Sequence, residues 1–152
     1  MPVKKLKDYL DDHHVKYITI THSPAYTAQT VAQSAHIRGK EMAKTVIVRL
    51  DDGYAMAVLP ASHKVDLDYL KRGVHAKDVA LAAESEFEDL FPDCELGAMP
   101  PFGNLYDMDV YVAEELADDE EIAFNAGSHT ELVKMSYKDY ADLVTPKVIH
   151  IT

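Results

Sequence analysis

The chain of 152 residues is 47% hydrophobic and 27% charged, which is ordinary for a globular protein, and no apolar run approaches the roughly 20 residues of a membrane helix. Its formal net charge of −11 argues, taken alone, against a nucleic-acid partner. The one cysteine, Cys94, excludes an intrachain disulfide, and the charged N-terminus does not resemble a signal peptide, so we expect a cytoplasmic protein.

The first half of the chain predicts two helices, a strand and a hairpin. Apolar residues at helical spacing predict a helix over 3–13, and β-branched and aromatic residues predict a strand over 16–22. Thr27 is expected to cap a second helix that runs to about residue 36. Two apolar runs on either side of Asp51-Asp52-Gly53 predict a hairpin within 45–60.

The second half predicts further short strands and helices. The expected helices lie near 66–71 and over 84–91, and the expected strands cover 79–82, 109–115, 121–127 and 131–136. Ser136 and Asp139 form a capping pattern before a helix that Pro146 ends, and a last strand follows it. Helices that alternate with hairpins predict a single α/β domain over 1–152 with a mixed rather than purely parallel sheet.

No metal or cofactor motif is present. The eight histidines show neither HxxxH nor HExxH spacing, and Cys94 has no CxxC partner. The sequence also lacks the G-x-S-x-G elbow, the P-loop and the GxGxxG fingerprint. We therefore expect neither a metal ion nor a cofactor.

Lys44 is a first candidate for a functional residue. It stands between Ala43 and the apolar run 45–48, at the start of a strand that is predicted to be buried. A lysine in this position must extend its ammonium to solvent, pair with an acid or meet an anionic ligand. Position alone leaves these alternatives open.

The stretch LGAMPPFG, residues 96–103, is a second candidate. Gly97 and Gly103 allow a positive φ or close backbone approach, whereas Pro100-Pro101 fix φ and remove two amide donors. The carbonyls of such a loop are expected to be free to face a ligand or a water. The alternative is a stiff connection that Phe102 anchors in the core.

A third candidate is the turn Gly127-Ser128-His129-Thr130. It combines a flexible backbone, two hydroxyls and an imidazole, a density of polar groups typical of a reacting centre. The same residues are equally typical of a simple turn between two strands.

Taken together and in this order, these stretches resemble the YbaK/EbsC family of freestanding aminoacyl-tRNA deacylases, which are related to the editing (insertion) domain of bacterial prolyl-tRNA synthetase. The resemblance extends over nearly the whole chain, and its specificity lies in the order and spacing of lysine, glycine loop and late glycine turn. The stretches that carry it are HSPAYTAQTVA (22–32), AKTVIVR (43–49), VLPASHKVD (58–66), VALAAESEFEDLF (79–91), GAMPPFG (97–103) and FNAGSHTELVKMSYKDYADLV (124–144).

The resemblance implies a mixed α/β fold with a strongly curved sheet, surrounding helices and a groove for the aminoacylated 3′ end of a tRNA. It implies that Lys44, Gly97 and His129 form the catalytic centre, with Lys44 on the phosphate or ribose of the terminal adenosine. It leaves open whether His129 acts as a base, binds substrate or shapes the loop. The residues implied in substrate binding are Tyr26, Met99, Pro100, Pro101, Phe102, Gly127, Ser128 and Thr130.

The implied activity is trans-editing, the hydrolysis of the ester of a mischarged aminoacyl-tRNA. The resemblance implies a small amino acid such as alanine or cysteine, carried on tRNA-Pro, and the histidine after Gly127 favours a small substrate such as alanine. An aminoacyl ester is already activated, so placement of a water and stabilisation of the oxyanion can suffice without a triad or metal. The alternatives are a non-catalytic domain of the same fold that binds a tRNA end or a synthetase and, with less support, a histidine-based metal hydrolase.

The implied partner is the acceptor end of an aminoacyl-tRNA, with an aminoacyl-tRNA synthetase as a second candidate; membranes and DNA are not expected. The charge distribution allows this, because residues 1–77 hold 12 Lys and Arg against eight acids, whereas residues 78–152 hold three against 18. Few phosphate contacts imply weak, salt-sensitive binding. The expected basic rim consists of Lys4, Lys5, Lys7, Arg38, Lys40 and Lys64.

Overall fold

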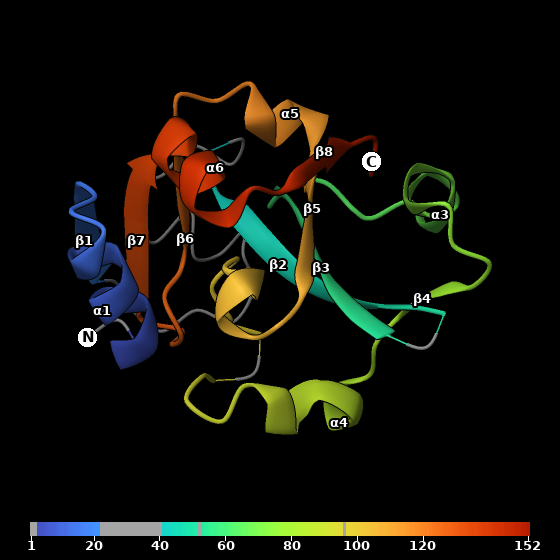
Figure 1. Cartoon of the computed structure of the whole chain (residues 1–152), viewed down its shortest axis with the longest axis horizontal. Coiled ribbons are helices and arrows are strands. Elements are labelled where there is room, and N and C mark those ends of the chain that lie inside the picture. Colours follow the sequence, from blue (N-terminus) through green and yellow to red (C-terminus); the bar gives the residue numbers. More distant parts are fainter. Residues whose placement is uncertain (1–2, 22–40, 52, 96) are drawn as a thin grey trace.

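The computed structural model describes residues 3–21, 41–51, 53–95 and 97–152, and its strands form two sheets with helices around them (Figure 1). The strands are β1 (Tyr17–Thr21), β2 (Ala43–Leu50), β3 (Gly53–Pro60), β4 (Val79–Leu81), β5 (Asp109–Ala113), β6 (Glu121–Asn125), β7 (Glu131–Ser136) and β8 (Lys147–Ile149). The helices are α1 (Lys4–Asp12), α3 (Leu67–Val74), α4 (Glu84–Phe87), α5 (Glu114–Ala117) and α6 (Tyr137–Val144), with 3-10 turns at Glu88–Leu90 and Gly103–Leu105. None of these described helices has the length and apolar character to cross a membrane.

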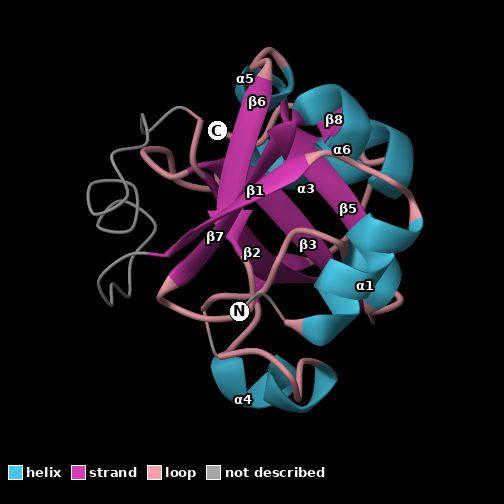
Figure 2. Cartoon of the chain, turned by 90° about the vertical axis from the view of Figure 1, so that its left-hand side faces the viewer, coloured by secondary structure: helices cyan, strands magenta, loops and turns pink. Residues whose placement is uncertain are grey.

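The strand pairing confirms the predicted mixed α/β architecture, with the strands divided between two sheets. The smaller sheet is antiparallel in the order β1-β7-β6, and the larger has the order β4-β2-β3-β5-β8. β2 pairs antiparallel with β3 and β4, whereas β5 lies parallel to β3 and β8. A parallel bridge between Met42 and Ala123 joins β2 to β6, so the two sheets meet beside the start of β2 (Figure 2).

The predicted elements agree with the structure except at their ends. The hairpin of β2 and β3 is confirmed, as is the cap of α6, where the Ser136 hydroxyl accepts from the Asp139 amide at 3.1 Å. The strand expected over 109–115 ends at Ala113, because the chain turns there into the short helix α5. The helix expected at 84–91 is one α-helical turn followed by a 3-10 turn. The helix expected over 27–36 lies outside the described residues.

An aromatic cluster fills the core between the two sheets. The ring of Phe102, which is fully buried, lies 5.5 Å from that of Phe124 on β6 and 5.3 Å from that of Tyr140 on α6. The Tyr140 hydroxyl donates to the carbonyl of Pro101 at 2.7 Å. The loop that contains Pro101 and Phe102 is therefore fixed to α6 by ring packing and by one buried hydrogen bond.

Replacing Tyr140 by Phe should lower the free energy of unfolding by about 1–3 kcal/mol, because the buried Pro101 carbonyl loses its donor. Tyr137→Phe is the matched control on the same helix: its buried hydroxyl has no hydrogen-bond partner within the described residues, so its removal should cost almost nothing. Urea denaturation followed by circular dichroism measures both variants. Equal losses for the two would contradict an anchoring role for the Tyr140 hydroxyl.

Candidate functional site

Two segments about thirty residues apart in sequence, the loop 95–102 and the turn 126–130, are held together by backbone hydrogen bonds. The amide of Gly127 donates to the carbonyl of Ala98 at 2.9 Å, and the carbonyl of Gly127 accepts from the amide of Glu95 at 2.8 Å. We call the two segments together the loop–turn unit. The structure thus brings the glycine loop and the late glycine turn of the sequence analysis into direct contact.

Both glycines of the loop–turn unit have left-handed backbone conformations. Gly97 has a φ of +82°, and a β-carbon built on it would lie 3.4 Å from Cε1 of His129. Gly127 has a φ of +100°, and a β-carbon there would lie 2.9 Å from Cβ of Val3. Any other residue at either position would be strained, and at Gly127 it would also displace α1 from the turn.

His129 is held against the loop from two sides. Only 8% of the residue is exposed, and its ring approaches the α-carbon side of Gly97. Its backbone amide donates to a carboxylate oxygen of Glu95 at 3.0 Å, and its Nε2 lies 3.9 Å from the same oxygen. Glu95 therefore fixes the backbone of the turn and lies near the imidazole, in an arrangement that could orient the ring for binding or for proton transfer.

The expectation that the carbonyls of the loop are free is wrong for three of them. The carbonyls of Ala98, Pro100 and Pro101 accept from Gly127, Phe102 and Tyr140 respectively. Within the described residues, the carbonyls of Gly97 and Met99 accept no hydrogen bond that the fold supplies. These two are the candidates for holding a water or a hydroxyl.

Met99 and Phe102 are buried in the main core, and Met99 is 4% exposed. Because Phe102 packs on Phe124 and Tyr140, its observed contacts are those of a residue that anchors the loop. The hydroxyls of Ser128 and Thr130 lie 3.3 Å apart and bond to each other across the turn. Tyr26 lies outside the described residues. Its role and those of the other substrate-binding residues stay predictions.

Lys44 lies on β2 opposite Leu59 of β3, and its side chain is partly buried. Burial lowers the pKa of Lys44, and the charge of nearby Lys64 lowers it further. Among the described residues, no hydrogen bond or ion pair joins the Lys44 ammonium to the loop–turn unit. A partly desolvated ammonium beside a second lysine is well suited to an anion, which would relieve both effects.

The sheet geometry links Lys44 to the turn through β6. Met42 and Ala123 form the bridge between β2 and β6, and bridge partners carry their side chains on the same face of a sheet. Side chains alternate along a strand, so Lys44 and Asn125, each two residues further on, also share that face. We call it the Lys44–Asn125 face. Phe124 points the opposite way, into the main core.

Sequence reasoning missed Asn125. Its signal is weak but readable: a polar residue ends the apolar strand EIAFN immediately before the glycine turn. In the structure Asn125 is 8% exposed and lies opposite Leu132 of β7.

Cys94 lies near the turn but does not have the properties of a nucleophile. Its Sγ would be 3.7 Å from a β-carbon on Gly127. Burial is the largest cause that raises the pKa of the Cys94 thiol from 9.0 to about 11, so the thiol stays protonated at neutral pH. Within the described residues, no group of three His, Cys, Asp or Glu side chains could hold a metal ion.

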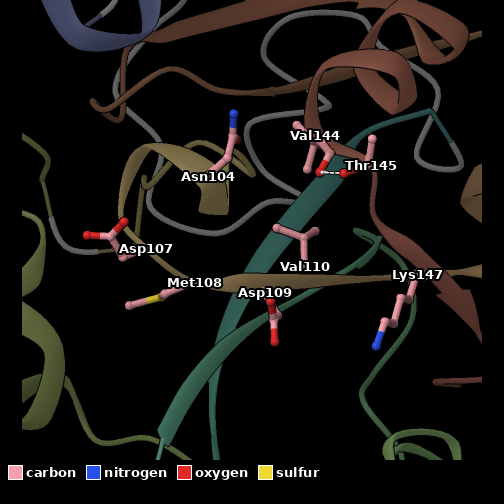
Figure 3. A pocket seen from close by; sticks show the side chains of 8 residues that line it. All are labelled: Asn104, Asp107, Met108, Asp109, Val110, Val144, Thr145 and Lys147. Atoms are coloured by element: carbon pink, nitrogen blue, oxygen red, sulfur yellow. Dashed lines mark hydrogen bonds between the residues drawn. The ribbon is translucent and has the colours of Figure 1, made fainter.

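Among the hollows of the described surface, two of similar size lie on different parts of the molecule. One of about 300 Å³ adjoins the loop–turn unit and is lined by Val3, Pro92, Asp93, Cys94, Glu95, Gly127 and Ser128. The other, of about 320 Å³, opens where β5 begins and shares no lining residue with the first (Figure 3). It combines Asp107 and Asp109 with Lys147, and none of the predicted site residues lines it.

The glycines of the loop–turn unit should tolerate alanine poorly. Gly97→Ala should cost about 1 kcal/mol of unfolding free energy through its left-handed φ, and Gly127→Ala more, through the added contact with Val3. Gly53→Ala is the control, because a β-carbon there meets nothing within 4 Å. Thermal unfolding of the three variants measures the order of their stabilities. A Gly127→Ala variant as stable as Gly53→Ala would contradict the described turn.

Alkylation of Cys94 by iodoacetamide at pH 8 should be about 100-fold slower in the folded protein than in urea. A thiol pKa raised from 9.0 to about 11 leaves roughly that much less thiolate. Mass spectrometry of timed samples gives both rates. Equally fast alkylation in the folded state would show that the Cys94 thiol is not held protonated as described.

Known proteins match both the sequence and the fold. Residues 22–143 match the family model of the aminoacyl-tRNA editing domain. The multifunctional Ser/Thr-tRNA deacylase ProXp-y of Escherichia coli (strain K12) is 26% identical over 156 residues, which cover 97% of this chain and 90% of that protein.

Solved structures share the fold at low sequence identity. The hypothetical protein APE2540 superposes with a TM-score of 0.86 at 18% identity, over 97% of this chain and 99% of that one. A crystal structure described as a proposed trans-editing enzyme for prolyl-tRNA synthetase superposes with a TM-score of 0.83 at 20% identity, over 99% and 96%. These structures show the shared fold. The family match over residues 22–143 shows that the chain belongs to the aminoacyl-tRNA editing domain family and is a hydrolase of the aminoacyl-tRNA deacylase type.

Proposed function

We propose that this protein acts in trans on mischarged tRNA and hydrolyses the ester that joins a small amino acid to the terminal ribose. The observation that carries the proposal is the loop–turn unit, in which His129 is fixed against Gly97 at the end of the strand that also carries Asn125. The E. coli relative, a Ser/Thr-tRNA deacylase, adds support for small substrates.

The reaction requires one water and no covalent enzyme intermediate. The water oxygen attacks the ester carbonyl carbon, and the bond from that carbon to the ribose oxygen breaks. The leaving ribose oxygen takes up a proton, which leaves free amino acid and uncharged tRNA. The carbonyls of Gly97 and Met99 are the groups on the loop that would accept from the attacking water and orient it.

His129 can contribute to the same step in either of two ways. Its ring lies against Gly97 and near the Glu95 carboxylate, so it would either accept the water proton or hold the aminoacyl group in place. Cys94 would take no part, since its thiol is protonated at neutral pH.

Lys44 would bind a phosphate of the tRNA terminus as a point charge. Its pKa is lowered by burial and by Lys64, and a bound phosphate would offset both causes by stabilising the charged form. The interaction is electrostatic and involves few phosphates, so affinity should fall with salt along a shallow slope.

The direct test is release of amino acid from alanyl-, cysteinyl-, seryl- and threonyl-tRNA, including their mischarged tRNA-Pro forms. We expect turnover of at least one of them and no turnover of correctly charged prolyl-tRNA-Pro. Lys44→Ala should lower kcat/KM by about 10-fold or more, because a phosphate contact is lost. Lys71→Ala, at an exposed lysine on α3, should leave kcat/KM unchanged.

Two results would contradict the proposal. Full activity of Lys44→Ala would remove the role given to that lysine. Measurable tRNA affinity without turnover on any charged tRNA would instead identify a binding domain of the same fold.

A further inference from the structure

Asn125 is a buried polar side chain that the fold leaves incompletely satisfied. The residue is 8% exposed, and its Oδ1 is buried without a hydrogen-bond partner among the described residues. Its neighbours along the strand and across the ladder are apolar: Phe124, Ala126 and Leu132. An aliphatic side chain would suit this position better, because a buried unpaired acceptor destabilises the folded state.

The position of Asn125 relates this acceptor to the site. Asn125 is the last residue of β6, and the turn that carries His129 begins at the next residue. Its side chain lies on the Lys44–Asn125 face, on the same side of the Met42–Ala123 bridge as the lysine that would bind the tRNA terminus. Two other buried polar atoms lack a described partner, Nδ1 of His63 just beyond β3 and the hydroxyl of Tyr137 on α6, and neither is on the strand that leads into the turn.

The charges on the Lys44–Asn125 face indicate what kind of donor the Oδ1 atom of Asn125 can accept from. Lys44 contributes one positive charge, and Lys134, opposite Ala123 in the ladder, carries a charge that an acid on the same face offsets. The carboxylate of Glu121 on the same face is 3.7 Å from the Lys134 ammonium. Beside the Lys44 ammonium, a neutral hydroxyl donor meets no charge repulsion, whereas a second cation placed equally close would.

We propose that Asn125 is a specificity residue whose side-chain carbonyl accepts a hydrogen bond from the hydroxyl of a seryl or threonyl group. This inference rests on the proposed function and names the class of amino acid that the site selects. A site that bonds a substrate hydroxyl rejects the analogue without it, because its own polar group is then left unpaired. Seryl- and threonyl-tRNA are therefore preferred over alanyl-tRNA.

The test compares Asn125→Leu with wild type on seryl- and alanyl-tRNA that share one tRNA body. The substitution should lower kcat/KM for the seryl ester by about 10- to 100-fold and leave the alanyl ester within about twofold, because only the seryl ester loses a bond. Asn104→Leu is the matched control at an exposed asparagine that lines the hollow of Figure 3, and it should change neither value.

Equal losses on both esters would overturn the proposal, since they would indicate a structural role or contact with the α-amino group. Unchanged activity on the seryl ester would overturn it as well. Because Asn125→Leu could fail to fold, the wild-type protein provides a second measurement: the hydrolysis-resistant amide analogue seryl-aminoadenosine should bind about 10-fold or more tightly than its alanyl counterpart.

The two proposals fail in different ways. If wild type hydrolyses no aminoacyl-tRNA, the proposed function fails, and analogue binding to wild type and to Asn125→Leu still decides the role of Asn125. If wild type hydrolyses esters but prefers alanyl-tRNA, the proposed function stands and the assignment of Asn125 is overturned.

Discussion

The site depends on the backbone of Gly127, which bonds to both ends of the segment 95–98. Its amide and carbonyl engage Ala98 and Glu95, so the loop and the turn cannot move independently. The neighbouring carbonyl of Ala126 accepts from the amide of Val3, which adds the start of α1 to the same assembly. Three segments distant in sequence are thus positioned by three backbone hydrogen bonds, and two of them depend on the left-handed conformation of Gly127.

Side chains then fix this assembly to the body of the protein. Phe102 inserts between Phe124 and Tyr140, and the Tyr140 hydroxyl takes up the carbonyl of Pro101. One end of the loop is therefore rigid, while the carbonyls of Gly97 and Met99 accept no bond from the described fold. A loop of which most acceptors are satisfied and two are left open is suited to positioning a water without a nucleophilic side chain.

Much of the fold could be predicted from local patterns. The Asp-Gly hairpin and the Ser136 cap are set by residues close in sequence, so their chemistry was readable. The end of β5 could not be predicted in this way. The apolar and acidic residues of 109–115 suit a strand as well as a helix, and the turn at Ala113 depends on contacts with residues distant in sequence.

The membership of the site and the roles of its residues stay predictions, whereas the contact between the glycine loop and the glycine turn is described by the structure. Lys44, the glycine loop and the glycine turn were identified, but the bonds that occupy three loop carbonyls come from Gly127 and Tyr140 as well as from the loop itself. Asn125 was missed because its significance arises only when the bridge between Met42 and Ala123 sets the face of β6. The alternation of side chains along β6 can be predicted from its sequence, whereas the identity of the strand that lies beside it cannot.

The contact between Val3 and Gly127 also bears on how the protein should be handled. Anything fused ahead of residue 3 would emerge at the rim of the glycine turn, next to the hollow that Val3 itself helps to line. The C-terminus lies across the molecule, near β8 and α3 (Figure 1). An affinity tag or a fluorescent reporter at the C-terminus would leave the glycine turn uncovered. One at the N-terminus would lie beside the turn and would compete with a substrate that binds there.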